Sequence, residues 1–377
     1  MKKLQMLAVG DIVLGPNADF YFELTAGVLK QADVVVGHLE VPHTDREEHS
    51  IKLGRRPETL ASLARAGFHV MTLAGNHLMD AGAAGVEGSI AGLRRYGLVP
   101  VGAGINLAEA RRAAVVERDG VRFGFLNYNC VGPVKTWAAE HKPGCAYIGV
   151  VVQRQGAEDP GSMFSPEVLL TNLSEPDIRT KCVPITLEWM KEDVTVLRRM
   201  CDVVVVVFHK GIVHTPIRLA QYEREVAHAA VDAGVDVVFS HHSHILHGIE
   251  VYKGKTIYHG LCNFATYVPV SAFQHQEMPP NWAEERIKRF GFVPDPEYPT
   301  YPFHPEARYT IIAKCEVSGG NITRTGFLPC IVNKQGRPVI VKRENGGEEV
   351  LNYMIRITEG ADLNGKYAWE GDEVVIK

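Results

Sequence analysis

A histidine-rich stretch, FSHHSHILHGIE, occupies positions 239–250. The chain has 16 histidines among 377 residues, and this window alone holds four of them: His241, His242, His244 and His247. Imidazole nitrogens are common metal ligands, so the stretch is a candidate part of a metal site. A polar loop rich in histidine has the same composition, and the stretch by itself does not distinguish the two.

Residues able to bind a metal or transfer a proton follow five short apolar segments that resemble buried strands. These residues are Asp11 after LAVG, His38 and Glu40 after VVVG, Asn76 and His77 after MTLAG, His209 after VVVVF, and His241, His242 and His244 after VVFS. In parallel α/β sheets, ligands bind beyond the carboxyl ends of the strands, so these five ends are expected to meet. Asp11 alone could cap a turn and His209 alone could be a core histidine, but the joint pattern favours one shared centre.

The chemistry of this set is that of metal binding. Carboxylate, amide oxygen and imidazole together suit divalent cations such as Mn²⁺, Zn²⁺ or Fe²⁺. One zinc ion takes three or four protein ligands. About six candidates are available here, enough for two ions that share a bridging carboxylate. We therefore expect divalent metal ions as cofactors, two of them in one centre.

Alternating strand and helix patterns surround these residues and predict an α/β fold. Apolar runs at 33–37 and 69–75 indicate buried strands, and helical spacing is present at 57–68 and 86–97. The alternation returns with a helix at 187–200, a strand at 202–211, a helix at 217–233 and a strand at 235–244. From 308 onward the pattern predicts mainly strands, including one at 350–357.

Two irregular segments, about 127–187 and 267–307, interrupt this pattern and are interpreted as inserts. The second is rich in proline and aromatic residues, which predicts a lid, an interface or a surface excursion. We expect one metal-binding domain over 1–330, which includes both inserts, and a β-rich C-terminal extension over 331–377.

Composition and charge exclude several classes of protein. The apolar fraction of 46% is that of a globular chain, and a net charge of −4 gives no broad basic field for nucleic acid or a membrane surface. The N-terminal MKKLQMLAVG predicts a buried first strand, because its apolar run is too short for a secretory signal. Seven cysteines without a Cys-x-x-Cys pair are typical of free thiols in a reducing compartment. We expect a cytoplasmic protein with no nucleic-acid or membrane partner; whether it forms a homo-oligomer stays open.

Several blocks of the sequence resemble the CapA family, which is named for a poly-γ-glutamate capsule biosynthesis protein and is similar to the calcineurin-like metallophosphoesterases. The blocks are VGDIVLG (9–15), ADVVVGHLEVPHT (32–44), LARAGFHVMTLAGNHLMDAG (63–82), GLVPVGAGINLAEARR (97–112), VVVVFHKG (204–211) and VVFSHHSHILHGIEVYKGKTIYHGLCNF (237–264). The resemblance implies a four-layer α/β/β/α sandwich around a metal centre.

The resemblance also implies roles for single residues. The expected metal ligands are the residues that match the family's motifs: Asp11, Glu40, Asn76, His209, His242 and His244. His77 is expected to be the general acid, oriented by Asp80, with a purely hydrogen-bonding role as the alternative. Asn263 matches the Asn of the family's Gly-Asn-Phe block, and it is expected to contact the substrate together with His241.

Two departures from the family pattern bear on the metal ligands. The superfamily motif Asp-x-His is here the tripeptide at 11–13, Asp-Ile-Val, so one histidine ligand is missing. His38 stands where the family has Asn. We expect His38 among the catalytic residues, either as an extra ligand or over the substrate.

Cations near the site form a third departure. Lys210 stands where the family has Trp, directly after a predicted ligand, and Arg55 and Arg56 precede a predicted helix. We expect these three side chains to hold a phosphate or carboxylate group of the substrate. Solvated surface charge is the alternative.

These expectations lead to a metal-dependent hydrolase that uses a metal-activated water, with a phosphoester of a small or oligomeric anionic substrate as the bond cleaved. Hydrolysis of an amide or γ-glutamyl bond, linked to polyglutamate-type chemistry, is the first alternative, because a fold does not determine one function. A non-catalytic binding or assembly protein is the second alternative.

Overall fold

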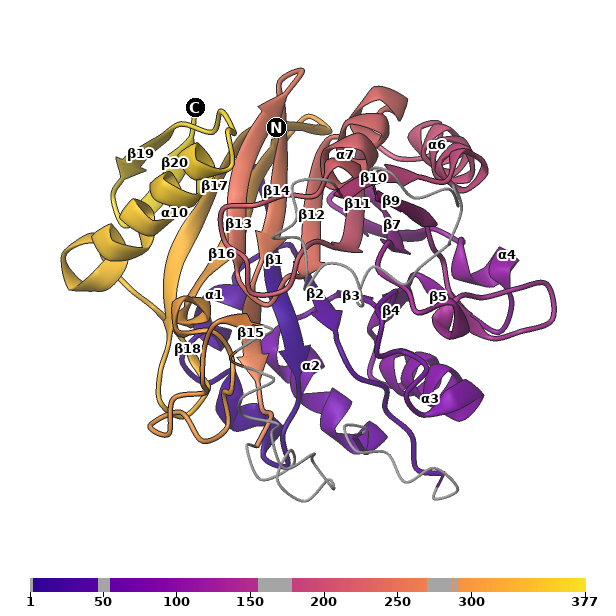
Figure 1. The fold of residues 1–377 in the computed structure, drawn as a ribbon, viewed down its shortest axis with the longest axis horizontal. Helices are drawn as coiled ribbons and strands as arrows, with labels where there is room; N and C mark the ends of the chain where they lie inside the picture. The colour runs from indigo at the N-terminus through magenta and orange to yellow at the C-terminus, as the bar shows by residue number, and fades with distance from the viewer. Residues whose placement is uncertain (1–2, 47–54, 155–177, 270–286, 288–289) are drawn as a thin grey trace.

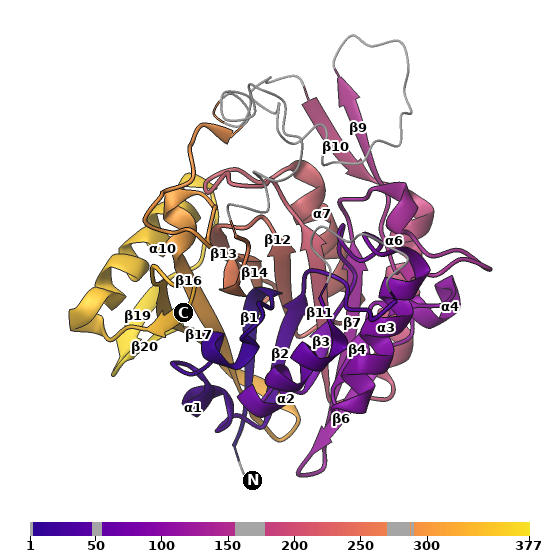
Figure 2. The same ribbon diagram turned by 90° about the horizontal axis from the view of Figure 1, so that it is seen from below.

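The computed structural model describes residues 3–46, 55–154, 178–269, 287 and 290–377. Two β-sheets pack face to face around a shared core, and helices cover their outer faces (Figure 1). Figure 2 shows α1 (Ala26–Leu29), α2 (Ala61–Ala66) and α3 (Gly82–Arg95) beside one sheet, with α6 (Pro184–Arg198) and α7 (Gln221–Ala233) beside the other. The predicted four-layer α/β/β/α sandwich is therefore confirmed.

The two sheets are mixed, and the strands that carry the candidate site run parallel within each. The first sheet has the order β19 (Tyr367–Glu370), β20 (Glu373–Ile376), β17 (Asn321–Val332), β16 (Tyr309–Ser318), β1 (Leu4–Val13), β2 (Val34–Leu39), β3 (Val70–Thr72) and β4 (Val99–Val101), with β15 (Asn263–Thr266) beside β1 and β18 (Pro338–Ile340) beside β17. The second has the order β13 (Leu246–Tyr252), β14 (Lys255–Leu261), β12 (Val237–His242), β11 (Val203–Lys210), β7 (Val121–Asn129) and β6 (Ala114–Arg118). Strands β1 to β4 are parallel, as are β7, β11, β12 and β14.

Short elements complete the chain. The pairs β5 (Ala103–Gly104) with β8 (Gly144–Cys145) and β9 (Val150–Arg154) with β10 (Ile178–Cys182) form small separate sheets. Among the described residues, the remaining short helices and helical turns are η1 (Ala18–Tyr21), η2 (Pro57–Leu60), α4 (Leu107–Ala110), η3 (Val134–Thr136), η4 (Pro305–Arg308) and η5 (Arg343–Gly347), and η5 leads into the longer helix α10 (Glu348–Gly360).

Alternation of side chains along the strands builds the layers. On β11, Val205 and Val207 face the core between the sheets, whereas Val206 and Phe208 face the layer of α6 and α7. Full burial of such a side chain contributes about 1.5–3 kcal/mol, so a strand that is apolar on both faces is held firmly on both. The predicted strand at 202–211 owes its unbroken apolar run to this double burial.

Most predicted elements near the site are present. The N-terminal segment forms β1, and the helix predicted at 57–68 consists of η2 followed by α2. Helix α2 ends at Gly67, whose φ of 102° lies in the left-handed region that favours glycine. All seven cysteines are buried free thiols, as expected from their spacing.

The strand predicted at 350–357 is wrong, because these residues lie in α10. Val350, Met354 and Ile357 are buried and recur at helical spacing, and α10 packs against β13. The aromatic and β-branched residues of this segment are typical of a strand. Their spacing nevertheless gives a helix one apolar face, and this face packs against the sheet. Strand β17 runs across position 330, and the division into a domain and an extension stays a prediction.

Both predicted inserts are described only in part. Residues 155–177 of the first, and residues 270–286 and 288–289 of the second, lie outside the described residues. The described part of the first insert includes η3, β8, β9 and β10. In the described chain, no helix is both long and apolar enough to cross a membrane.

Candidate metal centre

Asp11 reaches the space between the sheets because β1 contains a bulge. Met6 and Ala8 face the core between the sheets and Leu7 and Val9 face outward, so strict alternation would turn position 11 outward. The pairing of β1 with β2 shifts between Ala8 and Asp11, where β1 has an extra residue. A bulge of this kind re-aims the side chains beyond it. Asp11 therefore faces inward and is fully buried.

Gly10 makes this bulge sterically feasible. A Cβ at position 10 would lie 2.2 Å from the backbone oxygen of Cys262, the same oxygen that accepts a hydrogen bond of 2.9 Å from the Asp11 amide. Only glycine permits so close an approach of two backbones. The Gly-Asp pair thus combines the backbone contact with the inward carboxylate.

Strand β2 brings His38 and Glu40 to the same inner face. The two residues are two positions apart, and Val34 and Val36 before them face the core between the sheets. In the ladder between β1 and β2, His38 lies opposite Asp11. His38 is 0% exposed and Glu40 is 3% exposed, so three of the predicted site residues meet in a desolvated space.

The second sheet contributes histidines at the ends of β11 and β12. His209 continues the inward face of β11 and lies opposite His241 in the ladder between the two strands. His242 has a φ of 88° and His244 a φ of 52°, which is the left-handed region that non-glycine residues rarely adopt. This backbone brings His242 to the inner side, where its amide donates to Asp11 Oδ2 at 3.2 Å. Strain of this kind concentrates at functional sites.

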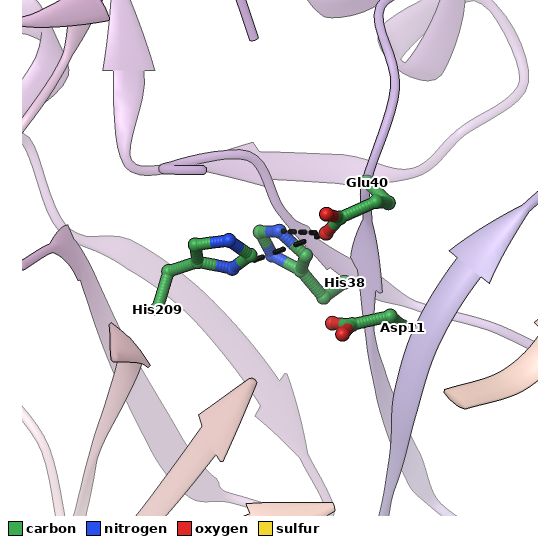
Figure 3. Close-up of side chains that lie close together, drawn as sticks. All are labelled: Asp11, His38, Glu40 and His209. Carbon is green, nitrogen blue, oxygen red and sulfur yellow. Dashed lines mark ion pairs between the residues drawn. The ribbon is translucent and has the colours of Figure 1, made fainter. Parts of the chain in front are cut away.

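Glu40 lies at the middle of the cluster. Figure 3 shows Asp11, His38, Glu40 and His209 pointing toward one another, and one potential ligand atom of each lies within 4.8 Å of the others. Glu40 Oε2 is 3.3 Å from His38 Nε2 and 4.0 Å from His209 Nδ1. Glu40 Oε1 is 3.7 Å from His244 Nε2. A carboxylate with imidazoles on both sides has the arrangement of a bridging ligand.

The loop after β3 adds the predicted Asn-His pair. Asn76 Oδ1 is 2.7 Å from His209 Nε2, so the amide lies among the predicted ligands. His77 is 30% exposed; its Nδ1 is 2.6 Å from Asp80 Oδ2, and its Nε2 is 4.0 Å from Glu40 Oε1. His77 therefore stands at the solvent side of the cluster, held by Asp80.

Many buried polar atoms of this cluster make no hydrogen bond within the described residues. These atoms are Asp11 Oδ1, Glu40 Oε1 and Oε2, His38 Nε2, His209 Nδ1, His241 Nδ1 and His242 Nε2. One unpaired buried polar group costs about 1–3 kcal/mol, so several in one place imply a partner that the chain does not itself supply. Oxygen and imidazole atoms in this number suit divalent cations, and the residues therefore fit the predicted metal ions.

The electrostatics around Asp11, His209 and His242 favour the protonation states that bind metals, whereas at His244 burial is outweighed by the hydrogen bond with Asp11 and by nearby Glu40, which raise its pKa. Burial, together with neighbouring histidines, lowers the pKa of His209 and of His242 well below the usual value. Burial alone would raise the pKa of Asp11, but the hydrogen bond with His244 and the nearby His241 lower this pKa to about 2. Neutral imidazoles and an ionised carboxylate are the forms in which these groups coordinate a cation.

Lys210 is not brought to this centre, so its predicted contact with a substrate anion is not supported. Lys210 follows His209 on β11 and therefore faces the opposite side of the sheet. Its Nζ donates to Glu223 Oε2 at 3.1 Å and lies 3.1 Å from His259 Nδ1, and its side chain is 0% exposed. The alternation of the strand, which the sequence already contains, accounts for this position.

The two arginines predicted to hold a substrate anion, Arg55 and Arg56, also lie away from this role: Arg55 binds backbone oxygens, and Arg56 is on the surface. Arg55 donates from Nε to the backbone oxygen of Leu14 at 2.6 Å and from Nη2 to that of Tyr267 at 3.3 Å. These contacts join three segments of backbone. Arg56 is exposed at the residue before η2, and its contact with a substrate stays a prediction.

The two other residues predicted at the substrate are buried beside the candidate ligands. His241 donates from Nε2 to a backbone oxygen of β1 at 2.9 Å, and its ring stacks on His38 with 5.0 Å between centroids. Asn263 Oδ1 lies 2.9 Å from His244 Nδ1, and Asn263 Nδ2 donates to the Tyr301 hydroxyl at 3.2 Å. Their positions suit the orientation of ligands better than contact with a substrate.

Sequence reasoning missed three side chains around the centre. Thr72, the last residue of β3, has its Oγ1 2.8 Å from His38 Nδ1. The rings of His214 and Phe303 lie 6.1 Å and 5.2 Å from the ring of His244. The strand-end rule that selected the other residues could have included Thr72. His214 and Phe303 come from loops that only the folded chain brings together.

A model of the family described as bacterial capsule synthesis protein PGA_cap matches residues 5–267. The chain belongs to this family. A capsule biosynthesis protein CapA of Bacillus anthracis is 29% identical over 280 residues, which cover 70% of this chain and 60% of the relative. The PGA biosynthesis protein CapA of Bacillus subtilis (strain 168) is 27% identical over 271 residues, 68% of this chain and 61% of the relative. This PGA_cap chain thus spans about three fifths of the length of these relatives.

Other relatives and some solved structures are more distant. A probable polyglutamine synthesis accessory protein of Mycobacterium tuberculosis is 29% identical over 208 residues, 54% of this chain and 47% of the relative. A putative 5'-nucleotidase from Staphylococcus aureus has a TM-score of 0.43 at 10% identity, covering 95% of this chain and 58% of that one. A calcineurin-like phosphoesterase from Bacillus subtilis has a TM-score of 0.40 at 13% identity, covering 95% and 97%.

Proposed function

We propose that this PGA_cap protein is a metal-dependent hydrolase with its active site at the carboxyl ends of β1, β2, β11 and β12. The observation that carries the proposal is the set of buried oxygen and nitrogen atoms around Glu40 that have no hydrogen bond within the described residues. The residues that would hold the cations are Asp11, Glu40, Asn76, His209, His242 and His244. When bound, divalent cations would activate a water and polarise the bond under attack.

The chain's own acid–base group in this proposal is His77. Asp80 Oδ2 lies 2.6 Å from His77 Nδ1, which orients the ring. The other nitrogen, Nε2, lies on the side of Glu40, and the ring is partly exposed, so a substrate can reach it. His77 would give a proton to the leaving group while the buried residues keep their positions.

We favour a phosphoester of a small anionic substrate, because a centre of two cations sharing a carboxylate suits the in-line displacement at phosphorus. An amide or γ-glutamyl bond is the second candidate. It is favoured by the names of the relatives, a PGA biosynthesis protein and a probable polyglutamine synthesis accessory protein. The same activated water could attack either bond.

Metal analysis of the purified chain, followed by assays on phosphoester and amide panels with added Mn²⁺, Zn²⁺ or Fe²⁺, tests this proposal. We expect tightly bound metal and turnover on one panel. Less than one bound metal per chain with no turnover on either panel would overturn it. His77→Ala should lose most activity on substrates with poor leaving groups and keep its metal. The exposed His141→Ala, with an 89% exposed side chain, is the matched control and should behave like the unaltered chain.

A further inference from the structure

His38 differs in its surroundings from a histidine that serves only to pack the core. It is fully buried, lies opposite Asp11 in the β1–β2 ladder, and shares the inner face of β2 with Glu40. We propose that His38 Nε2 is a metal ligand in this chain and supplies the imidazole that Val13 cannot supply in the Asp-Ile-Val tripeptide. The proposal rests on the metal centre of the proposed function.

A hydrogen bond determines which nitrogen of His38 carries the proton. The Thr72 hydroxyl has one hydrogen, and it donates this hydrogen to the backbone oxygen of Gly37 at 3.3 Å. Thr72 Oγ1 therefore accepts the hydrogen bond of 2.8 Å that joins it to His38 Nδ1. We therefore assign the proton to Nδ1, which leaves the lone pair of Nε2 available. A metal-binding histidine is typically fixed in this way through its other nitrogen.

The lone pair of His38 Nε2 faces a second acceptor. Glu40 Oε2 lies 3.3 Å away, and neither atom makes a hydrogen bond within the described residues. Two acceptors at this distance, with 0% and 3% exposure, repel each other unless a cation or a proton lies between them. A divalent cation meets both lone pairs at once.

The space beside His38 Nε2 depends on a glycine. A Cβ at Gly75 would lie 2.9 Å from His38 Nε2 and 3.4 Å from Cε1 of His209. Gly75 lies in the loop after β3, next to the predicted ligand Asn76. A side chain at this position would contact both imidazoles, so glycine keeps this side of His38 Nε2 clear.

The decisive variant is His38→Leu, which keeps a similar volume and removes both nitrogens. Each protein is stripped with a chelator and then given Co²⁺, with visible absorption and calorimetry as readouts of ligand geometry and affinity. We expect His38→Leu to lower the affinity of at least one site by about 100-fold or more and to change the absorption. Thr72→Val, which removes only the orienting partner, should cost about 10-fold. His43→Leu removes another fully buried histidine of the same segment and should bind Co²⁺ as the unaltered chain does.

Gly75→Ala provides a second route to the same answer if His38→Leu does not fold. The added methyl group fills the space beside His38 Nε2 and should weaken Co²⁺ binding while His38 itself is retained. If the unaltered chain binds Co²⁺ and the variants at 38 and 75 that fold keep its stoichiometry, affinity and absorption, the role of His38 is wrong and the metal centre stands. If the unaltered chain binds no metal, both the proposed function and this inference are overturned.

Discussion

Strand β11 separates two buried polar clusters of opposite character. On its inner face, His209 meets Asn76, His242 and Glu40, and the cluster retains carboxylate and imidazole atoms without hydrogen bonds among the described residues. On its outer face, Lys210 pairs with Glu223 and contacts His259. Both faces are desolvated, and adjacent residues of one strand take part in each.

The difference teaches that burial of polar groups does not by itself indicate a site. The charges of the outer cluster neutralise each other, so the cluster needs nothing from outside the chain. The inner cluster has several oxygen and imidazole acceptors directed at one another, which is unfavourable without an added cation. Unpaired atoms, rather than polar residue types, distinguish the candidate centre from a structural ion pair.

The largest expected effect is the loss of metal-dependent turnover when a residue of the inner cluster is replaced. Glu40→Ala removes the central carboxylate and should reduce metal-dependent turnover to background, because the proposed cations would lose a ligand that they share. Turnover assays together with the metal content of the purified variant measure this effect. His259→Gln, a change in the outer cluster, is the control and should keep both. Equal losses in the two variants would remove the distinction between the clusters.

A smaller but still large effect is expected on stability in the outer cluster. Glu223→Gln leaves Lys210 buried without its anionic partner, which typically costs about 3–5 kcal/mol. Denaturant unfolding at neutral pH measures this loss in the free energy of unfolding. The double variant Lys210→Met with Glu223→Leu should recover most of it, since an apolar pair of similar size needs no partner. A Glu223→Gln variant as stable as the unaltered chain would contradict the outer cluster's structural role.

Stabilisation by added metal should depend on the inner cluster and not on the outer one. A ligand at 100 times its dissociation constant raises the free energy of unfolding by about 2.7 kcal/mol when it binds only the folded chain. We expect this increment in the unaltered chain and in Glu223→Gln, but not in Glu40→Ala. Unfolding curves with added metal and with excess chelator give the increments. Stabilisation of Glu40→Ala by the full amount would mean that the metal binds elsewhere.

The smallest expected effect is a dependence of stability on pH that comes from His259. Burial, together with nearby Lys210, lowers the pKa of His259 from 6.5 to about 4. The unfolded chain therefore binds this proton more readily, and the stability contribution is lost as pH falls from about 6.5 toward 4. His259→Gln should flatten this part of the curve of unfolding free energy against pH. Parallel curves for the two proteins would show that His259 has no such effect.

The candidate centre was predictable in kind because its residues stand at strand ends. Asp11, Glu40 and His209 do meet between the sheets, as the rule for the carboxyl ends of parallel strands predicts. The position of Lys210 does not support its predicted contact with a substrate anion, and the sequence already contains the reason. The unbroken alternation along 203–210 puts it on the opposite face from His209, and a partner such as Glu223 is visible only in the folded chain.

Other parts of the site were beyond prediction. The bulge that turns Asp11 inward depends on the approach of Cys262 to Gly10, across a long stretch of sequence. The positive φ values of His242 and His244 come from the packing of the strand end, and no local propensity of histidine predicts them. Helix α10 stands where a strand was predicted. Its short apolar segment suits either element, and the packing of α10 against β13 decides between them.

The sequence by itself determined the α/β class, the positions of the strands that lead into the site and the types of ligand atom available at their ends, since these depend on local periodicity and side-chain chemistry. The tertiary structure alone decided which of those atoms face one another and which have partners. The physical reason is that a hydrogen bond or ion pair requires two groups that meet through packing. A buried histidine whose nitrogens have partners within the chain is structural, and one whose nitrogen faces an unpaired carboxylate oxygen is a candidate metal ligand.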